Sequence, residues 1–134
     1  MDIRAGDRAP DLERTITLAD MVAYAGATWD WHRLHYDSEF ARARGLGRPV
    51  VDGQHFGALL AQQLMNWLGP RAFLRRLSYR VSGIVFAGET IRCVAEVTEV
   101  EKGDADTVIH VTQTVFVDER VAIESAQAEI AVQS

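Results

Sequence analysis

An acidic and a basic side chain, Asp30 and His35, stand close together in the polar and aromatic stretch 28–37. On an α-helix, five steps of about 100° would set them about 140° apart, so they could not converge. Because residues 28–36 follow neither the helical nor the strand period, we expect a loop there, in which both side chains can enter one pocket. A carboxylate beside an imidazole can hold and activate a water molecule as a general acid/base pair. The same two residues could equally be ordinary loop hydrogen-bonding partners.

A second stretch, residues 48–53, leads into the strongest helical pattern of the chain, 53–68. If Asp52 is the N-cap of that helix, its carboxylate accepts a hydrogen bond from the N–H two or three positions on. The N–H of Gly53 then has no partner within the helix and lies at the positive end of the helix dipole. Without a side chain, Gly53 lets a ligand oxygen approach closely, as stabilisation of a developing oxyanion requires. By itself, Gly53 could instead simply permit a tight helix entry.

The elements that must position these two stretches are mainly helices before Pro70 and strands after it. Before it, Thr17 and Asp20 form a capping box for a first short helix, and Asp37 or Ser38 can cap a second. After it, apolar residues alternate with polar ones, as in strands with one buried face. The expected elements are an extended segment over 11–17, helices over 18–25, 38–43 and 53–68, and strands that include 77–81, 91–97, 109–117 and 121–132.

The expected strands are too close together in sequence to be joined by crossover helices, so the sheet should be mainly antiparallel. Its last strand changes the parity of its apolar residues between Ile123 and Ala126, which is typical of a β-bulge. We therefore expect one α+β domain over 1–134, with the long helix packed on one face of a curled antiparallel sheet. Because one helix covers only part of such a sheet, we also expect a subunit partner.

The composition limits the classes of function. The chain has 134 residues, 48% of them hydrophobic and 25% charged, with a formal net charge of −5. This is a globular mixture, and the negative charge argues against nucleic acid as a partner. The N-terminal residues are polar and no apolar run approaches the roughly 20 residues that span a bilayer, so we expect no membrane association. A single cysteine, Cys93, favours the cytoplasm.

The two stretches together resemble the MaoC-like, (R)-specific enoyl-CoA hydratase group of hot-dog folds. The family pattern is Asp-x-Asn-Pro-Leu-His, followed by Arg-Pro-Ile-Val-His-Gly at the start of the long helix. Here the two blocks are Asp30-x-His32-Arg33-Leu34-His35 and Arg48-Pro49-Val50-Val51-Asp52-Gly53. The resemblance implies a hot-dog fold, a catalytic dyad of Asp30 and His35, and a backbone donor at Gly53 for the thioester oxygen. The implied reaction is the reversible addition of water across the C2–C3 double bond of a trans-2-enoyl-CoA. It implies no metal and no cofactor, since the coenzyme A thioester is the substrate.

Apart from the conservative exchange of Ile for Val50, four positions depart from the family. His32 replaces Asn, Arg33 replaces Pro, Asp52 replaces His, and Ala61 stands where some members carry Ser. With these departures the chain resembles the small subunits of bacterial steroid side-chain hydratases, which pair with a larger MaoC-like chain. The expected partner is therefore a second copy or a second MaoC-like chain. Two alternatives stay open, namely a non-catalytic or half-site subunit of a heteromeric hydratase, and a hot-dog thioesterase. The thioesterase is disfavoured because 54–68 contains no acidic residue.

Further residues could line the substrate site, and each has a structural alternative. The aromatic ones could wall an acyl pocket or pack in the core or an interface. The histidines could contact the site or brace and cap the backbone. Two arginines could bind the phosphates of coenzyme A or form a solvated strand face. These substrate-binding candidates are Trp29, Trp31, His32, Asp52, His55, Phe56, Arg75 and Arg76.

Overall fold

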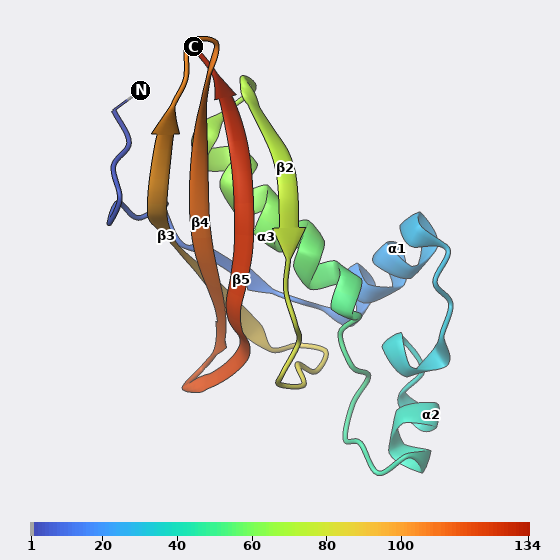
Figure 1. Ribbon diagram of the computed structural model, residues 1–134. Helices are drawn as coiled ribbons and strands as arrows, with labels where there is room; N and C mark the ends of the chain where they lie inside the picture. The colour runs from blue at the N-terminus through green and yellow to red at the C-terminus, as the bar shows by residue number, and fades with distance from the viewer. Residues whose placement is uncertain (1) are drawn as a thin grey trace.

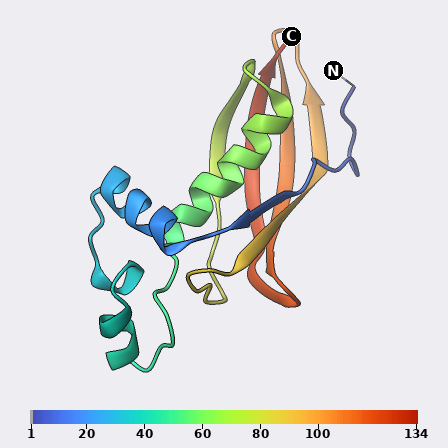
Figure 2. The same ribbon diagram turned by 180° about the vertical axis from the view of Figure 1, so that it is seen from behind.

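Five antiparallel strands and one long helix form the body of the computed structural model, which describes residues 2–134 (Figure 1). Seen from behind, the long helix α3 lies along the hollow of the curled sheet (Figure 2). The elements are β1 (Leu12–Thr15), α1 (Leu18–Thr28), the 3-10 helix η1 (Arg33–His35), α2 (Ser38–Ala43), α3 (Gly53–Leu68), β2 (Ala72–Ser78), β3 (Thr90–Lys102), β4 (Asp106–Val117) and β5 (Arg120–Gln133). The predicted α+β hot-dog architecture is confirmed.

The strand order is β1-β3-β4-β5-β2, and every pairing is antiparallel. The predicted antiparallel sheet is thus confirmed, and so is the irregularity in the last strand, where the β4–β5 register shifts between Gln113 and Val115. β2 ends at Ser78, so Tyr79 and Val81 lie beyond the strand that their alternation predicted. Regular pairing with β5 ends at Ser78, but the chain stays beside β5, because the N–H groups of Ser82 and Gly83 both donate to the carbonyl of Ala122 (2.8 and 3.1 Å).

Helix α3 is held on the sheet by an apolar stripe and by two buried amides. Phe56, Leu60 and Leu64 are almost completely buried, and burial of each such side chain contributes about 1.5–3 kcal/mol to stability. The Nε2 group of Gln63 donates to the carbonyl of Cys93 (2.9 Å), and that of Gln113 donates to the carbonyl of Leu60 (3.0 Å). These bonds fix the register of the helix against β3 and β4, because a shift would leave buried polar groups unpaired.

The helices α1 and α2 lie beyond the N-terminal end of α3, to one side of the sheet (Figure 1). The predicted capping box of α1 is present, since the Thr17 side chain accepts from the Asp20 N–H and the Asp20 carboxylate from the Thr17 N–H. α1 continues to Thr28, three residues past the predicted end, and α2 spans the expected 38–43. No helix within residues 2–134 combines the length and hydropathy needed to cross a bilayer.

Candidate active site

Asp30 is presented by the C-terminal turn of α1. Trp29 adopts a left-handed conformation (φ 58°) as the C-cap, and the Asp30 N–H closes the turn by donating to the carbonyl of Ala25 (3.1 Å). The next turn of chain bends back, so that the His32 N–H lies 3.5 Å from Oδ1 of Asp30. The helix end therefore fixes the backbone of Asp30, while its side chain receives only one long hydrogen bond from the loop.

His35 is the last residue of η1, and two bonds set its ring. The Nδ1 atom of His32 accepts from the Leu34 N–H (3.1 Å) and caps this short helix, so the bracing alternative for His32 is what the structure has. Nδ1 of His35 lies 2.8 Å from the carbonyl oxygen of Val50. Because a carbonyl can only accept, Nδ1 carries the proton and Nε2 of the neutral ring keeps its lone pair. That lone pair is the basic position of the site.

The residues before α3 form a short strap against the segment that precedes β3. The Val51 N–H donates to the carbonyl of Val85 (2.8 Å), and the Ala87 N–H donates to the carbonyl of Pro49 (2.9 Å). The strap ends in Asp52, the N-cap of α3, whose Oδ1 accepts from the N–H two positions on (3.0 Å). The predicted capping role of Asp52 is confirmed.

Gly53 opens α3 with an unused donor. Among the hydrogen bonds of residues 2–134, none has the Gly53 N–H as its donor. The phenol of Tyr79 donates to the Gly53 carbonyl (2.8 Å) and so ties the helix start to the chain that follows β2. Sequence reasoning missed this tie. The one sequence feature connected with it is the glycine at position 57 within the helix. A side-chain carbon there would lie 2.6 Å from the Tyr79 hydroxyl.

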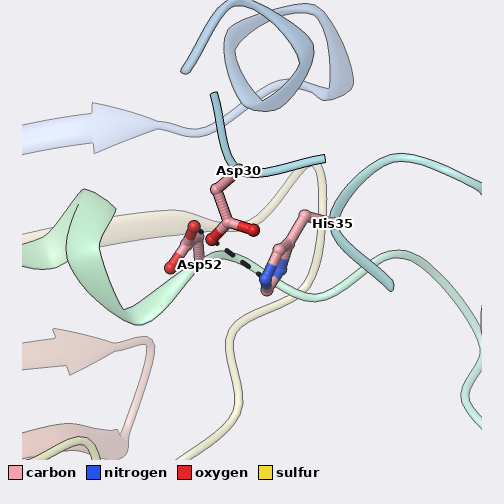
Figure 3. A group of neighbouring side chains, drawn as sticks. All are labelled: Asp30, His35 and Asp52. Carbon is pink, nitrogen blue, oxygen red and sulfur yellow. Dashed lines mark ion pairs between the residues drawn. The ribbon is translucent and has the colours of Figure 1, made fainter. Parts of the chain in front are cut away.

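Three side chains from these separate segments converge on one point. One atom of each of Asp30, His35 and Asp52 lies within 4.8 Å of the others, and the three side chains face one another (Figure 3). Nε2 of His35 lies 3.9 Å from Oδ2 of Asp52, and these two side chains are only 18% and 12% exposed. The Gly53 N–H follows Asp52 directly in the chain. The structure thus brings the predicted pair together beside Asp52, the residue that precedes the predicted donor.

The two carboxyl groups of this cluster lie close enough to shift each other's pKa. Hydrogen bonding to Asp52, with the His32 N–H and the neighbouring histidines, lowers the pKa of Asp30. Burial, followed by the bond to Asp30, raises the pKa of Asp52, against the opposing effect of the Gln54 N–H. The two pKa values therefore move apart, and Asp30 is the more readily ionised of the two carboxyl groups. Sequence reasoning placed Asp52 at the site but not in contact with Asp30.

One imidazole and two carboxyl groups at this spacing also have the composition of an open metal site. The expectation that the site needs no metal stays a prediction.

The other candidates near the cluster have mixed surroundings. His55 stacks on Tyr24 (ring centroids 4.4 Å apart) and has a buried Nδ1 atom without a partner within residues 2–134. Burial lowers the pKa of His55. Trp29 and Trp31 contact each other edge to face, and Trp29 is 79% exposed. Phe56 is a core residue whose ring also borders a small apolar pocket.

That pocket opens beside the start of α3 and has a volume of about 150 Å³. Its wall includes Val81, whose methyl group lies 3.8 Å from where a side-chain carbon on Gly53 would be. Ile84, another wall residue, is an exposed apolar side chain. The pocket is lined by Val50, Val51, Phe56, Val81, Ser82, Gly83, Ile84 and Val85.

The arginine candidates lie away from the cluster within one chain. Arg75 is the extra residue of a bulge between Leu74 and Arg76, and it pairs with Glu129 of β5 (3.3 Å). Arg75 also borders a surface groove that includes Pro70, just past the C-terminal end of α3. The sixteen residues of α3 span about 24 Å, so this groove is at the far end of the helix from Asp52. Binding of coenzyme A phosphates by Arg75 and Arg76 stays a prediction.

Comparison with known proteins places these features in one family. The profile of the family described as "MaoC like domain" matches residues 4–121. The (R)-specific enoyl-CoA hydratase of Aeromonas caviae is 32% identical over 91 residues, which are 65% of this chain and 66% of that protein. The fatty acid synthase subunit beta of Gibberella zeae is 33% identical over 81 residues, which are 60% of this chain. The match spans only 4% of the length of the synthase subunit.

Solved structures extend the likeness to the whole fold. A chain of the ChsH1-ChsH2 complex from Mycobacterium tuberculosis superposes with a TM-score of 0.88. The superposition covers 96% of this chain and 98% of that chain, at 24% sequence identity. At this identity the likeness establishes a common architecture, including the position of the long helix on the curled sheet.

Proposed function

Because this chain belongs to the MaoC-like domain family, we propose that it is a hydro-lyase that adds water reversibly to a trans-2-enoyl-CoA thioester. The single observation that carries the proposal is the convergence of Asp30 and His35 on Asp52, the residue directly before the free N–H of Gly53. The Aeromonas caviae relative bears the name of such a hydratase, which supports the same reaction. Coenzyme A enters as part of the substrate, and no metal or redox cofactor is proposed.

In the proposed reaction, one water molecule is split across the C2–C3 double bond. The Asp30 carboxylate and Nε2 of His35 both accept hydrogen bonds from that water, which orients its oxygen toward C3. The water hydroxyl bonds to C3, its released proton passes to the Asp30–His35 pair, and the pair returns a proton to C2. Dehydration is the same path in reverse.

The negative charge that forms between these two steps collects on the thioester oxygen. The Gly53 N–H is the proposed donor to that oxygen, since it is free and lies at the positive end of α3. The 150 Å³ apolar pocket beside Gly53 is the proposed seat of the first carbons of the acyl chain. Its apolar lining, which includes Val81 and Phe56, suits a hydrocarbon chain.

A partner chain is part of this proposal. Apolar side chains stand uncovered on both the site side and the sheet side, including Trp29, Ile84 and Phe73, the last 70% exposed. Exposed apolar patches of this kind mark interaction surfaces. The partner is a second copy or another MaoC-like chain, and the complex named in the Mycobacterium tuberculosis structure supports the second option. We propose the cytoplasm as the compartment, since the one thiol, Cys93, is buried and has a pKa raised to about 12 by burial.

The test is the loss of enoyl thioester absorbance with the purified chain, alone and with candidate partner chains. Short, medium and steroid-side-chain enoyl-CoA substrates distinguish a fatty-acyl from a steroid role. Asp30→Asn and His35→Ala should each lower kcat by about 10²–10⁴-fold, while thermal unfolding stays close to that of the unaltered chain. His110→Ala is the matched control, because His110 pairs with Glu101 on the sheet (2.7 Å).

A non-catalytic subunit is the second candidate, favoured by the departures at His32, Arg33 and Ala61 from the family pattern. If a complex retains full activity after both Asp30 and His35 of this chain are replaced, this chain is a non-catalytic subunit. Release of free thiol from acyl-CoA without hydration would instead identify a thioesterase.

A further inference from the structure

We propose that His55 is a positioning residue for the proposed reaction, whose neutral ring stacks on Tyr24 and holds the turn that carries Asp30 against the first turn of α3. The inference rests on the proposed function, since the two rings act on Asp30 and not on the substrate. It begins from the contact between these rings, which joins α1 to α3. The ring planes are 3° from parallel and the ring centroids lie 4.4 Å apart.

Tyr24 belongs to the turn of α1 that presents Asp30. The Tyr24 carbonyl accepts from Oγ1 of Thr28 (2.8 Å), and the carbonyl of the next residue, Ala25, accepts from the Asp30 N–H (3.1 Å). The backbone from Tyr24 to Asp30 is therefore one hydrogen-bonded turn. A contact that holds the Tyr24 ring also sets the place from which the Asp30 side chain starts.

His55 belongs to the first turn of α3, which also presents the proposed oxyanion donor. It lies two residues after Gly53, and its N–H donates to the carbonyl of Asp52 (3.0 Å). The amides of Gln63 and Gln113 hold the same helix on the sheet. The His55 ring is thus a support that is fixed relative to the donor, and the Tyr24 ring rests on it.

The space between α1 and the start of α3 is closed to solvent. The crevice between them has no room for a water molecule. It is lined by Met21, Tyr24, Ala25, His35, Asp52 and His55. Because water does not fill this crevice, the loss of either ring of the stack would leave a gap beside the cluster.

The surroundings of His55 favour its neutral ring. The Nδ1 atom is buried and has no hydrogen-bond partner in the part of the chain that the structure describes. A lone pair is tolerated there, whereas a proton on Nδ1 would leave a buried N–H without an acceptor. The ring also lies at the positive end of the α3 dipole, which disfavours a cation. A protonated His55 would therefore have to leave the stack.

The charged and titratable neighbours of His55 come from several elements. Asp20 and Tyr24 face it from α1, and Arg14 faces it from β1. Asp52 precedes α3 and His35 ends η1 on the other side of the ring's crevice. Burial lowers the pKa of His55, against the opposing effect of the two carboxylates.

Substitutions at the two rings separate the stack from the rest of the fold. His55→Phe and Tyr24→Phe each keep a flat ring, whereas His55→Ala and Tyr24→Ala each remove one. Ile130→Val is the matched control for lost stability, because it removes one buried methyl group from the core beside Leu64 and Leu68, in the C-terminal half of α3.

The experiment measures kcat and KM for an enoyl-CoA substrate together with hydrogen exchange of the Asp30 amide, with the partner chain present where activity needs one. Both alanine variants should lower kcat roughly 10–100-fold with little change in KM, because a displaced Asp30 misplaces the water and not the thioester. The Asp30 amide should exchange faster in the same two variants. The phenylalanine variants and Ile130→Val should keep the kcat and the exchange rate of the unaltered chain.

The pH profile of kcat tests the requirement for a neutral ring. In the unaltered chain and in Tyr24→Phe, protonation of His55 adds to protonation of the catalytic pair, so kcat should fall steeply in acid. In His55→Phe the acid limb should be shallower, because residue 55 no longer titrates. A merely structural contact would leave the steepness of the limb unchanged.

The outcomes separate this inference from the proposed function. Unchanged exchange of the Asp30 amide in the alanine variants overturns the role of His55, whether or not the chain hydrates enoyl-CoA. An alanine variant with the kcat of the unaltered chain, or an equally steep acid limb in His55→Phe, overturns it as well. Faster exchange and lower kcat in both alanine variants, restored by phenylalanine, together with the shallower limb, establish it. If no sample hydrates enoyl-CoA, yet both alanine variants speed the exchange at Asp30, the stack holds the turn and the proposed function fails.

Discussion

Gly53→Pro removes the proposed oxyanion donor while leaving the rest of α3 in place. Proline has no N–H, and the first residue of a helix is the position that tolerates it best. The residue before a proline must be extended, and Asp52 already is, with φ −60° and ψ 134°. A side-chain carbon at 53 would meet only Val81, at an ordinary 3.8 Å. The substitution therefore fits the fold and removes the amide hydrogen of residue 53, which is the proposed oxyanion donor.

The expected loss follows from the bonds of the neighbouring amides. The Gln54 N–H is taken by the Asp52 carboxyl group and the His55 N–H by the Asp52 carbonyl (3.0 Å). Neither can replace the Gly53 N–H as a donor. Removal of a single oxyanion donor lowers kcat by about 10²–10³-fold, equal to about 2.7–4 kcal/mol of transition-state stabilisation. The free energy of unfolding should stay level or rise by about 0.4–1 kcal/mol, since proline restricts the unfolded chain.

The assay compares kcat and KM on an enoyl-CoA substrate with chemical unfolding of the same samples. Gly53→Ala is the matched control, because it keeps the N–H and adds only the carbon that contacts Val81. It should retain most of the activity. A proline variant that folds and retains the parent kcat would refute the assignment of the donor to Gly53.

Two further predictions concern the parts that support the site. Tyr79→Phe should cost about 0.5–1.5 kcal/mol of unfolding free energy by removing the bond to the Gly53 carbonyl, and Gly57→Ala about 1–3 kcal/mol by forcing the Tyr79 ring aside. In denaturant melts, the double variant should lose less unfolding free energy than the sum of the losses in the two single variants. Strictly additive losses would mean that the Tyr79 ring does not lie against Gly57. The bonds from the Phe40 N–H and from Arg33 lower the pKa of Asp37, so its charge stabilises α2 above the ordinary carboxyl pKa of about 3.9. The advantage over Asp37→Asn, which keeps the cap, should therefore vanish as the pH falls from about 4 toward the lowered folded pKa, and pH-dependent melts that show a constant difference would contradict this.

Local rules predicted the start of α3 because every contact there lies within a few residues. The cap at Asp52 and the free N–H of Gly53 depend only on which residues precede an apolar helical stripe. The capping box at Thr17 is local in the same way. In each case the partner is two or three positions on, so the sequence alone contains both members of the bond.

The rest of the site depends on contacts between distant segments. Nothing near Asp30 in the sequence indicates that Asp52 will lie beside it, because the strap over 49–52 must first pair with 85–87. β2 pairs with β5 instead of with β3, the next strand along the chain. α1 runs past its predicted end at residue 25 because its left-handed C-cap falls on Trp29. The bulge at Arg75 leaves Arg75 and Arg76 both exposed between the inward-facing Leu74 and Leu77, which strict alternation along a strand does not predict.

The buried amides of Gln63 and Gln113 leave α3 no freedom to slide or turn on the sheet, because either motion would strand hydrogen-bonding groups in the interior. The end of α3 that carries Gly53 is thus as fixed as the strands beneath it. If the site widens to admit a bulky acyl group, the wall opposite α3 must move. That wall consists of α1, η1 and α2, which stand off the end of the sheet (Figure 1) and bury few side chains: Met21 and Ala25 in α1, Ala41 in α2 and none in η1. The α3 side of the site is therefore the fixed side. The α1–η1–α2 side, which carries Asp30 and His35, is the side that adjusts to the size of the acyl group.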